Sequence, residues 1–140
     1  NGDTKFTPIH CSDLTDTIFH VISSNIHSKI VECVGPEILS LKEILKKLLK
    51  LINKNRLLVS LPFIAANMTA KLFQLFPKPL LTVDQLVLLK YDNICSNKYQ
   101  TNSDIGVPST RIFDQEVKKY CYMWREGGQF STKKYNTKNS

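Results

Sequence analysis

The sequence predicts a small α/β protein with about three short strands and four to five helices. Extended apolar runs alternate with amphipathic helical patterns, in the order strand, helix, strand, helix, strand, helix, helix, loop, helix. Hydrophobic residues make up 42% and charged residues 22% of the 140 positions, which is the ordinary balance of a globular domain. No apolar run approaches the ~18 residues that a transmembrane helix needs.

The N-terminal quarter predicts two strands and one helix. The stretch KFTPIHCSD, residues 5–13, indicates a short strand of irregular or edge character, because its proline lacks a backbone donor. Asp13 is then expected to cap a helix over 14–24, where apolar residues recur at helical spacing. The run SKIVECVG, residues 28–35, is apolar at nearly every position and predicts a second strand covered on both faces. A Gly-Pro pair ends it.

The clearest helical pattern is SLKEILKKLLKLINK, residues 40–54. Ser40 and Glu43 form a capping box there, in which each side chain binds the backbone N–H of the other residue. The lysines of this helix lie mostly opposite an apolar stripe. RLLVSLP, residues 56–62, predicts a third strand. FIAANMTAKLFQLF, residues 63–76, predicts a helix that is apolar around most of its circumference, so it is either buried or faces a partner or lipid.

The C-terminal half predicts two further helices separated by a polar loop. VDQLVLLKY, residues 83–91, follows a second capping box of the form Thr-x-x-Gln. Residues 92–110 are polar and loop-like, and RIFDQEVKKYCYMW, residues 111–124, predicts the last helix. We expect one domain over 1–124. The tail over 125–140 lacks apolar periodicity and is predicted to be disordered.

The sequence contains no catalytic or metal-binding motif. Its five glycines are too scattered to form a phosphate-binding loop, and no acidic pair is placed for acid–base chemistry. The cysteines lack the spacing of zinc ligands and are too sparse for a disulfide scaffold, so we expect reduced thiols in a reducing compartment. They are Cys11, Cys33, Cys95 and Cys121. We therefore predict no catalytic residue, no metal site and no cofactor bound by this chain itself.

His10 is the one residue with a candidate chemical role. On a strand, alternate side chains share a face, so Pro8 and His10 point the same way. The imidazole is therefore a candidate to line a pocket. The alternative is a half-buried structural histidine whose polar atoms bind the backbone. Asp13, three residues later, is a further pocket candidate as well as the expected helix cap.

The net charge of +7 attracts phosphate groups, although a lysine-rich surface also serves solubility alone. Basic residues gather over 42–56 and again from Arg111 onward. Lysine dominates and arginine is scarce, so no nucleic-acid partner is expected. Lysines beside an unusually apolar helix suit an anionic membrane surface, and a domain core or protein interface is the alternative for its phenylalanines. The membrane-facing or partner-facing candidates are Lys46, Lys47, Lys50, Phe63, Lys71, Phe73 and Phe76.

Four segments carry a family resemblance. KFTPIHCSDLTDTI (5–18) is similar to the strand-to-helix segment that follows the catalytic half of extended and atypical short-chain dehydrogenases/reductases (SDRs). VECVGPEILSLKEILKKL (31–48) resembles the next G-G-P-E segment of that family, with valine in place of the first glycine. LTVDQLVLLKYDNI (81–94) resembles a segment of a narrower group, the SDR-like accessory subunits of respiratory complex I and their bacterial relatives. SDIGVPST (103–110) resembles the usual SDR ending. The resemblance covers residues 2–115.

This resemblance implies the C-terminal, substrate-side region of an extended SDR, a small three-layer-like part from which the Rossmann half is absent. NAD(P)H would bind to that N-terminal half, which would also be the first partner of this chain. Phe6 stands where sugar-nucleotide epimerases of the superfamily often have a phosphate-binding arginine. The resemblance thus adds Phe6 to Pro8, His10 and Asp13 as substrate-pocket candidates.

For the complex I group, the resemblance implies docking to complex I subunits and to the membrane surface. The expected location is cytoplasmic, or peripheral on the inner face of the cytoplasmic or mitochondrial inner membrane. Two alternatives stay open: the substrate domain of an active NAD(P)-dependent SDR oxidoreductase, and a basic lipid- or nucleic-acid-binding module outside the family. Exposed strand edges also suggest homo-oligomers.

Overall fold

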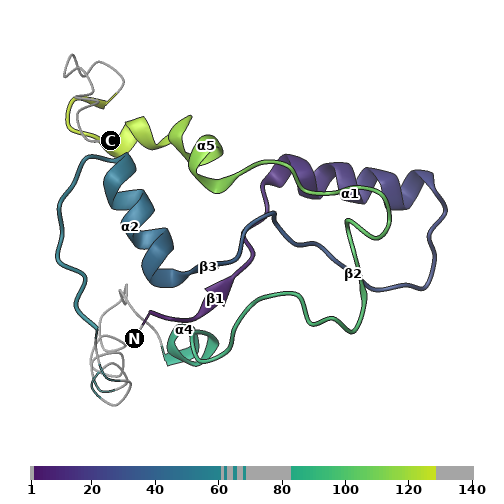
Figure 1. Ribbon diagram of the computed structural model, residues 1–140, viewed down its shortest axis with the longest axis horizontal. Helices are drawn as coiled ribbons and strands as arrows, with labels where there is room; N and C mark the ends of the chain where they lie inside the picture. The colour runs from purple at the N-terminus through teal and green to yellow at the C-terminus, as the bar shows by residue number, and fades with distance from the viewer. Residues whose placement is uncertain (1, 61, 63–64, 66–67, 69–82, 129–140) are drawn as a thin grey trace.

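The computed structural model describes residues 2–60, 62, 65, 68 and 83–128. Over these residues the chain is a small α/β protein with four α-helices, one 3₁₀-helix and two small two-stranded sheets (Figure 1). The general α/β prediction is therefore confirmed. In chain order the elements are β1 (Lys5–Phe6), α1 (Cys11–Ser23), β2 (Val31–Glu32), β3 (Leu39–Ser40), α2 (Leu41–Leu51), α4 (Val83–Leu88), β4 (Gln100–Thr101), α5 (Phe113–Lys118) and η1 (Cys121–Trp124).

β1 lies at the centre of the first sheet and is paired along both of its edges. On one side it runs antiparallel to β3, with Phe6 opposite Leu39. On the other side Asn93 forms a parallel bridge to Phe6. The Asn93 N–H donates to the Lys5 carbonyl at 2.8 Å, and the Thr7 N–H donates to the Asn93 carbonyl at 3.2 Å. The N-terminal strand is thus an internal strand of this small sheet.

β2 and β4 form the second sheet as a short parallel pair, with Glu32 opposite Thr101. A parallel pair needs a long crossover connection, and here the connection contains β3, α2 and α4. The predicted burial of the second strand on both faces is wrong. Its two residues are only half-buried and Ile30 beside it is 60% exposed, because a pair of two-residue strands cannot cover both faces.

The side chain of Asn102, directly after β4, is fully buried and makes hydrogen bonds in three directions. Its Oδ1 accepts from the Val34 N–H at 3.0 Å. Its Nδ2 donates to the Val107 carbonyl at 3.0 Å and to Ser109 Oγ at 2.9 Å. Ser109 Oγ in turn donates to the Val34 carbonyl at 2.7 Å. This network joins the chain after β2 to the chain after β4.

The sequence predicts that Asp13 caps the first helix, and this prediction is wrong. The N-cap of α1 is His10, whose Nδ1 accepts from the Ser12 N–H at 3.2 Å, and the helix begins at Cys11 rather than at residue 14. Asp13 is 4% exposed and pairs with the guanidinium of Arg111, whose backbone N–H donates to Asp13 Oδ2 at 3.2 Å. A buried carboxylate needs such a cation, and only the folded chain supplies it.

The predicted third strand, residues 56–62, is wrong over 56–60 and 62, which have no regular secondary structure. Leu57 is 89% exposed and Val59 is 69% exposed, and an extended run with no neighbouring strand has no ladder of hydrogen bonds to join. β3 was not predicted, and β4 lies inside the predicted loop 92–110. Strand pairing is thus the part of the fold that differs most from expectation.

The helix predictions agree with the structure more closely than the strand predictions do. α2 lies within the predicted range 40–54, and α4 lies within 83–91. The predicted last helix, 111–124, is divided into α5 and η1, because Tyr120 leaves helical geometry with φ −123° and ψ −12°. The predicted helix 63–76, apart from positions 65 and 68, lies outside the described residues, as does Thr82 of the second capping box. Of the predicted tail, 129–140 also lie outside them.

The buried apolar residues of the described part come from four different elements. Leu39 belongs to β3, Leu86 to α4, Val117 to α5 and Cys121 to η1. α2 contacts both β3 and η1, and η1 also contacts α5, so α2 lies between the first sheet and the C-terminal end of the described chain (Figure 1). This arrangement fixes the position of α2, which carries the candidate site.

Gly35 lies against the extended chain that follows β1. Its N–H donates to the Thr7 carbonyl at 3.2 Å. A Cβ at this position would lie 1.8 Å from the Pro8 carbonyl oxygen, far inside van der Waals contact. Gly35 is therefore required by the close approach of two backbones, which also brings the first two family-like segments together.

We expect Gly35→Ala to lower the free energy of unfolding by about 3 kcal/mol or more, because the new methyl group has to push two backbones apart. Urea unfolding followed by far-UV circular dichroism measures this change. Gly106→Ala is the matched control: no atom lies within 4 Å of its added Cβ, and its φ of +88° adds only backbone strain, about 1 kcal/mol. Equal losses in the two variants would contradict the close approach at Pro8.

Candidate functional site

The first turn of α2 is fixed by the predicted capping box. The Glu43 N–H donates to Ser40 Oγ at 3.2 Å, and the Ser40 N–H donates to the Glu43 carboxylate at 2.7 Å. The Ser40 hydroxyl also donates to the Glu43 carboxylate at 2.7 Å. The two bonds that the carboxylate accepts, first from the Ser40 backbone N–H and then from the hydroxyl, hold the pKa of Glu43 below its ordinary value. The carboxylate also lies at the positive end of the helix dipole. The start of the helix is thus set by residues close in sequence.

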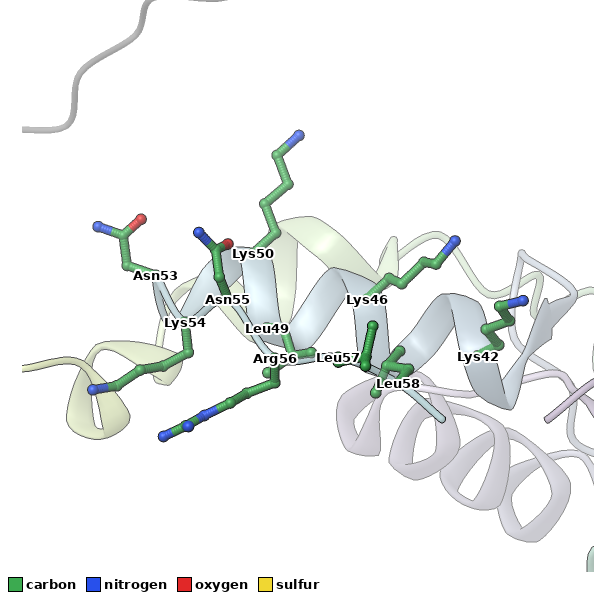
Figure 2. A pocket seen from close by; sticks show the side chains of 10 residues that line it. All are labelled: Lys42, Lys46, Leu49, Lys50, Asn53, Lys54, Asn55, Arg56, Leu57 and Leu58. Atoms are coloured by element: carbon green, nitrogen blue, oxygen red, sulfur yellow. The ribbon is translucent and has the colours of Figure 1, made fainter. Parts of the chain in front are cut away.

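The last turn of α2 sends the chain back beside the helix. Asn53 takes the left-handed conformation with φ 61°. Its N–H donates to the Lys50 carbonyl at 3.2 Å, and the Lys54 N–H donates to the Leu49 carbonyl at 3.0 Å. These two bonds make a Schellman motif, which ends a helix and reverses the chain. Residues 53–58 consequently return along the same face of α2 (Figure 2).

An open groove of about 680 Å³ lies between α2 and the returning segment (Figure 2). Of the described residues that line it, four are lysines, one is an arginine, three are leucines and two are asparagines, and none is acidic. They are Lys42, Lys46, Leu49, Lys50, Asn53, Lys54, Asn55, Arg56, Leu57 and Leu58. The helical members recur three and four positions apart, so they share one face of α2. The groove combines cationic walls with apolar leucine surface.

Most of the groove cations form no ion pair with another described residue. Lys54 Nζ lies 3.1 Å from Glu126 Oε1. The side chains of Lys42, Lys46, Lys50 and Arg56 form no ion pair or hydrogen bond with another residue that the structure describes. In Figure 2 the amines of Lys46 and Lys50 extend away from the helix into solvent. The positive potential of this face is therefore available to an external anion.

Lys47 has a different role from its neighbours. Its amine binds the carboxylate of Asp114, which lies on α5, and it does not line the groove. The hydrogen bond to Asp114 is the main cause that raises the pKa of Lys47 above its ordinary value. Lys47 thus ties α2 to α5, whereas Lys46 and Lys50 beside it line the groove.

The predicted partner-facing residues divide into three sets. Lys46 and Lys50 line the groove, and Lys47 is paired within the protein. Phe63, Lys71, Phe73 and Phe76 lie outside the described residues. The sequence had not selected Leu57 or Leu58, because residues 56–62 looked like a strand. The signal for their place is Asn53, a residue type that tolerates left-handed geometry after a helix.

The four substrate-pocket candidates lie near the N-terminus, and none of them lines the groove. Phe6 pairs with Leu39 in the first sheet, and Pro8 lies against Gly35. His10 caps α1 through Nδ1, and its Nε2 lies 3.7 Å from a Glu116 carboxylate oxygen. Asp13 is buried against Arg111, as described above. Each of these side chains or backbones has a structural contact, and their role in substrate binding stays a prediction.

The cysteines at positions 11, 33, 95 and 121 are all free thiols. In the described part of the chain, no three His, Cys, Asp or Glu side chains gather so as to hold a metal ion. Among the same residues, no helix has the length and apolar character needed to cross a membrane. The candidate functional site in the described part of the chain is the groove on α2.

Comparison with known proteins does not identify a family. No protein-family model matches the chain, and no curated protein matches it.

We expect Lys47 to react more slowly with acetic anhydride than Lys46 and Lys50, because its raised pKa leaves less of the amine unprotonated at a given pH. Mass spectrometry of peptides after brief labelling measures the three rates. Asp114→Asn should bring the rate of Lys47 up to that of its neighbours. Equal rates in the unaltered protein would contradict the Lys47–Asp114 pair.

Proposed function

We propose that this chain docks on an anionic membrane surface through the groove face of α2. The observation that carries the proposal is the lining of the groove, which holds five cationic side chains and no described carboxylate. Lysines near an anionic bilayer each contribute about 1 kcal/mol to binding, so several together give a useful affinity. The long lysine side chains also reach headgroups without burial of the charge.

A membrane fits the groove better than a nucleic acid does. Single-stranded nucleic acid is usually held by aromatic side chains interleaved with arginine, and the described lining of the groove contains leucine and asparagine instead of aromatic residues. Leucine surface beside lysine suits the boundary between headgroups and acyl chains. The overall charge of +7 acts in the same direction, since it draws the protein toward any anionic surface.

We further propose that the chain is the C-terminal, substrate-side part of an SDR-like protein, with NAD(P)H bound by a separate Rossmann half. The contacts among the family-like segments support this proposal. Gly35 of the second segment lies on Pro8 of the first, and Asn93 of the third bridges to Phe6. Ser109 of the fourth donates to the Val34 carbonyl. Docking to complex I would then place the groove beside the membrane.

We expect Lys46→Gln/Lys50→Gln to weaken binding to vesicles of phosphatidylcholine and phosphatidylserine about 30-fold, since two lysines together contribute about 2 kcal/mol. Co-sedimentation of the full chain over a range of lipid concentrations measures the affinity. Binding of the unaltered protein should also fall as salt rises, because ions screen the attraction over about 10 Å at 0.1 M.

The matched control is Lys29→Gln/Lys98→Gln. Both of these lysines are exposed and neither lines the groove, so the pair removes the same charge from elsewhere on the surface. The control should change binding far less than the groove variant. Equal weakening by the two variants would show that net charge alone is responsible and would overturn docking through the groove.

The SDR part of the proposal is tested with NADPH and isothermal calorimetry. We expect no micromolar binding, because a dinucleotide site needs a glycine-rich turn at a helix N-terminus and the glycines of this chain are scattered. The cofactor phosphates could still associate weakly with the groove, and Lys46→Gln/Lys50→Gln identifies that contribution. Micromolar binding that persists in this variant would contradict the assignment to the substrate-side part.

A further inference from the structure

The returning segment after α2 exposes large apolar side chains next to the groove cations. Leu57 is 89% exposed and Val59 is 69% exposed, although both belong to the most water-averse residue types. Residues 56–60 form no helix or strand, so the backbone of this segment is not tied into a sheet. Leu57 also lines the groove, together with Arg56 and Lys50. Apolar and cationic side chains therefore meet at one place on the surface.

A second apolar surface in the described chain provides a comparison. On α1, Ile18 is 50% exposed and both Phe19 and Ile22 are 71% exposed. Asp16 on the same helix is ion-paired with Arg111, with 3.3 Å between Arg111 Nη1 and Asp16 Oδ2, so this surface has no comparable group of cations beside it. α1 and α2 lie at opposite ends of the described structure (Figure 1). Large exposed apolar side chains also occur elsewhere in the described chain, for example Ile30 at 60% and Leu88 at 72%. The segment after α2 is the place where such side chains meet the cations of the groove.

We propose that residues 57–59 insert into the acyl region of the bilayer when the groove meets the lipid headgroups, with Leu57 and Val59 as the inserting side chains. This inference rests on the proposed docking function and adds to the electrostatic attraction a second step, the insertion of apolar side chains. The lysines and Arg56 would hold the protein at the headgroup level, while Leu57 and Val59 leave water for hydrocarbon. The apolar step would make binding specific for a bilayer over free phosphates or polyanions, because only the bilayer offers hydrocarbon.

The position of residue 57 in the bound state is measured by fluorescence. Trp124 is the single tryptophan of the chain and is 60% exposed, so Trp124→Phe gives a silent background. In that background, Leu57→Trp reports on the returning segment and Phe19→Trp reports on α1. Vesicles of phosphatidylcholine and phosphatidylserine with brominated acyl chains quench a tryptophan that enters the hydrocarbon. We expect quenching and a blue shift at position 57 and neither change at position 19.

A second experiment avoids the affinity of tryptophan itself for membranes. Leu57→Ser/Val59→Ser should weaken vesicle binding about tenfold or more, since two largely exposed apolar side chains lose their transfer into hydrocarbon. Phe19→Ser/Ile22→Ser is the matched control, with similarly exposed apolar residues, and should bind as the unaltered protein does. Binding of the serine variants to heparin beads, which present anions without hydrocarbon, should equal that of the unaltered protein.

The outcomes separate this inference from the proposed function. If vesicle binding depends on Lys46 and Lys50 while residue 57 is not quenched and the serine pair binds normally, insertion is overturned and electrostatic docking stands. If the unaltered protein does not bind anionic vesicles, both are overturned. Equal quenching at positions 57 and 19 would also overturn the inference, because it would show that the membrane does not select the segment after α2.

Discussion

The buried amide of Asn102 is the interaction on which the rest of the described structure depends. Every polar group of this residue has a partner: the side chain binds Val34, Val107 and Ser109, its N–H donates to the Glu32 carbonyl, and its carbonyl accepts from the Val107 N–H. A buried amide without these partners would be costly, so the network forms as a whole or not at all. By holding Val34, it sets Gly35 against Pro8 and leads the chain on toward Arg111.

The groove follows from constraints at both ends of α2 and from one ion pair along its length. The capping box sets where the helix begins, and the Schellman motif at Asn53 turns the next segment back along it. The pair between Lys47 and Asp114 fixes which face of α2 turns toward α5. Among the lysines of the groove, Lys42, Lys46 and Lys50 then form no ion pair with another described residue. A surface with this charge and with leucines beside it is suited to an anionic and apolar partner, which is the property of a lipid bilayer.

Helices were predictable from the sequence to a greater degree than strands. The pattern around Ser40 and Glu43 predicted α2 because the residues that fix its start are three apart. β4 was not predicted because it lies within a polar loop. Thr101 becomes a strand residue only by pairing with Glu32, which is far away in the chain. Residues 56–62 have the composition of a strand, but 56–60 and 62 pair with no strand in the described structure. The prediction from composition is therefore wrong there. The burial of Asp13 likewise depended on a distant arginine.

The sequence by itself determined that α2 is an amphipathic helix with many lysines, because periodicity and capping involve residues within one or two turns of each other. It did not determine which lysines are free to meet a partner. Lys46 and Lys47 are neighbours with the same chemistry, yet Lys46 lines the groove and Lys47 binds Asp114, 67 positions away. That difference was decided by tertiary structure, because the fold brings the Asp114 carboxylate of α5 to one lysine and leaves the other exposed at the groove.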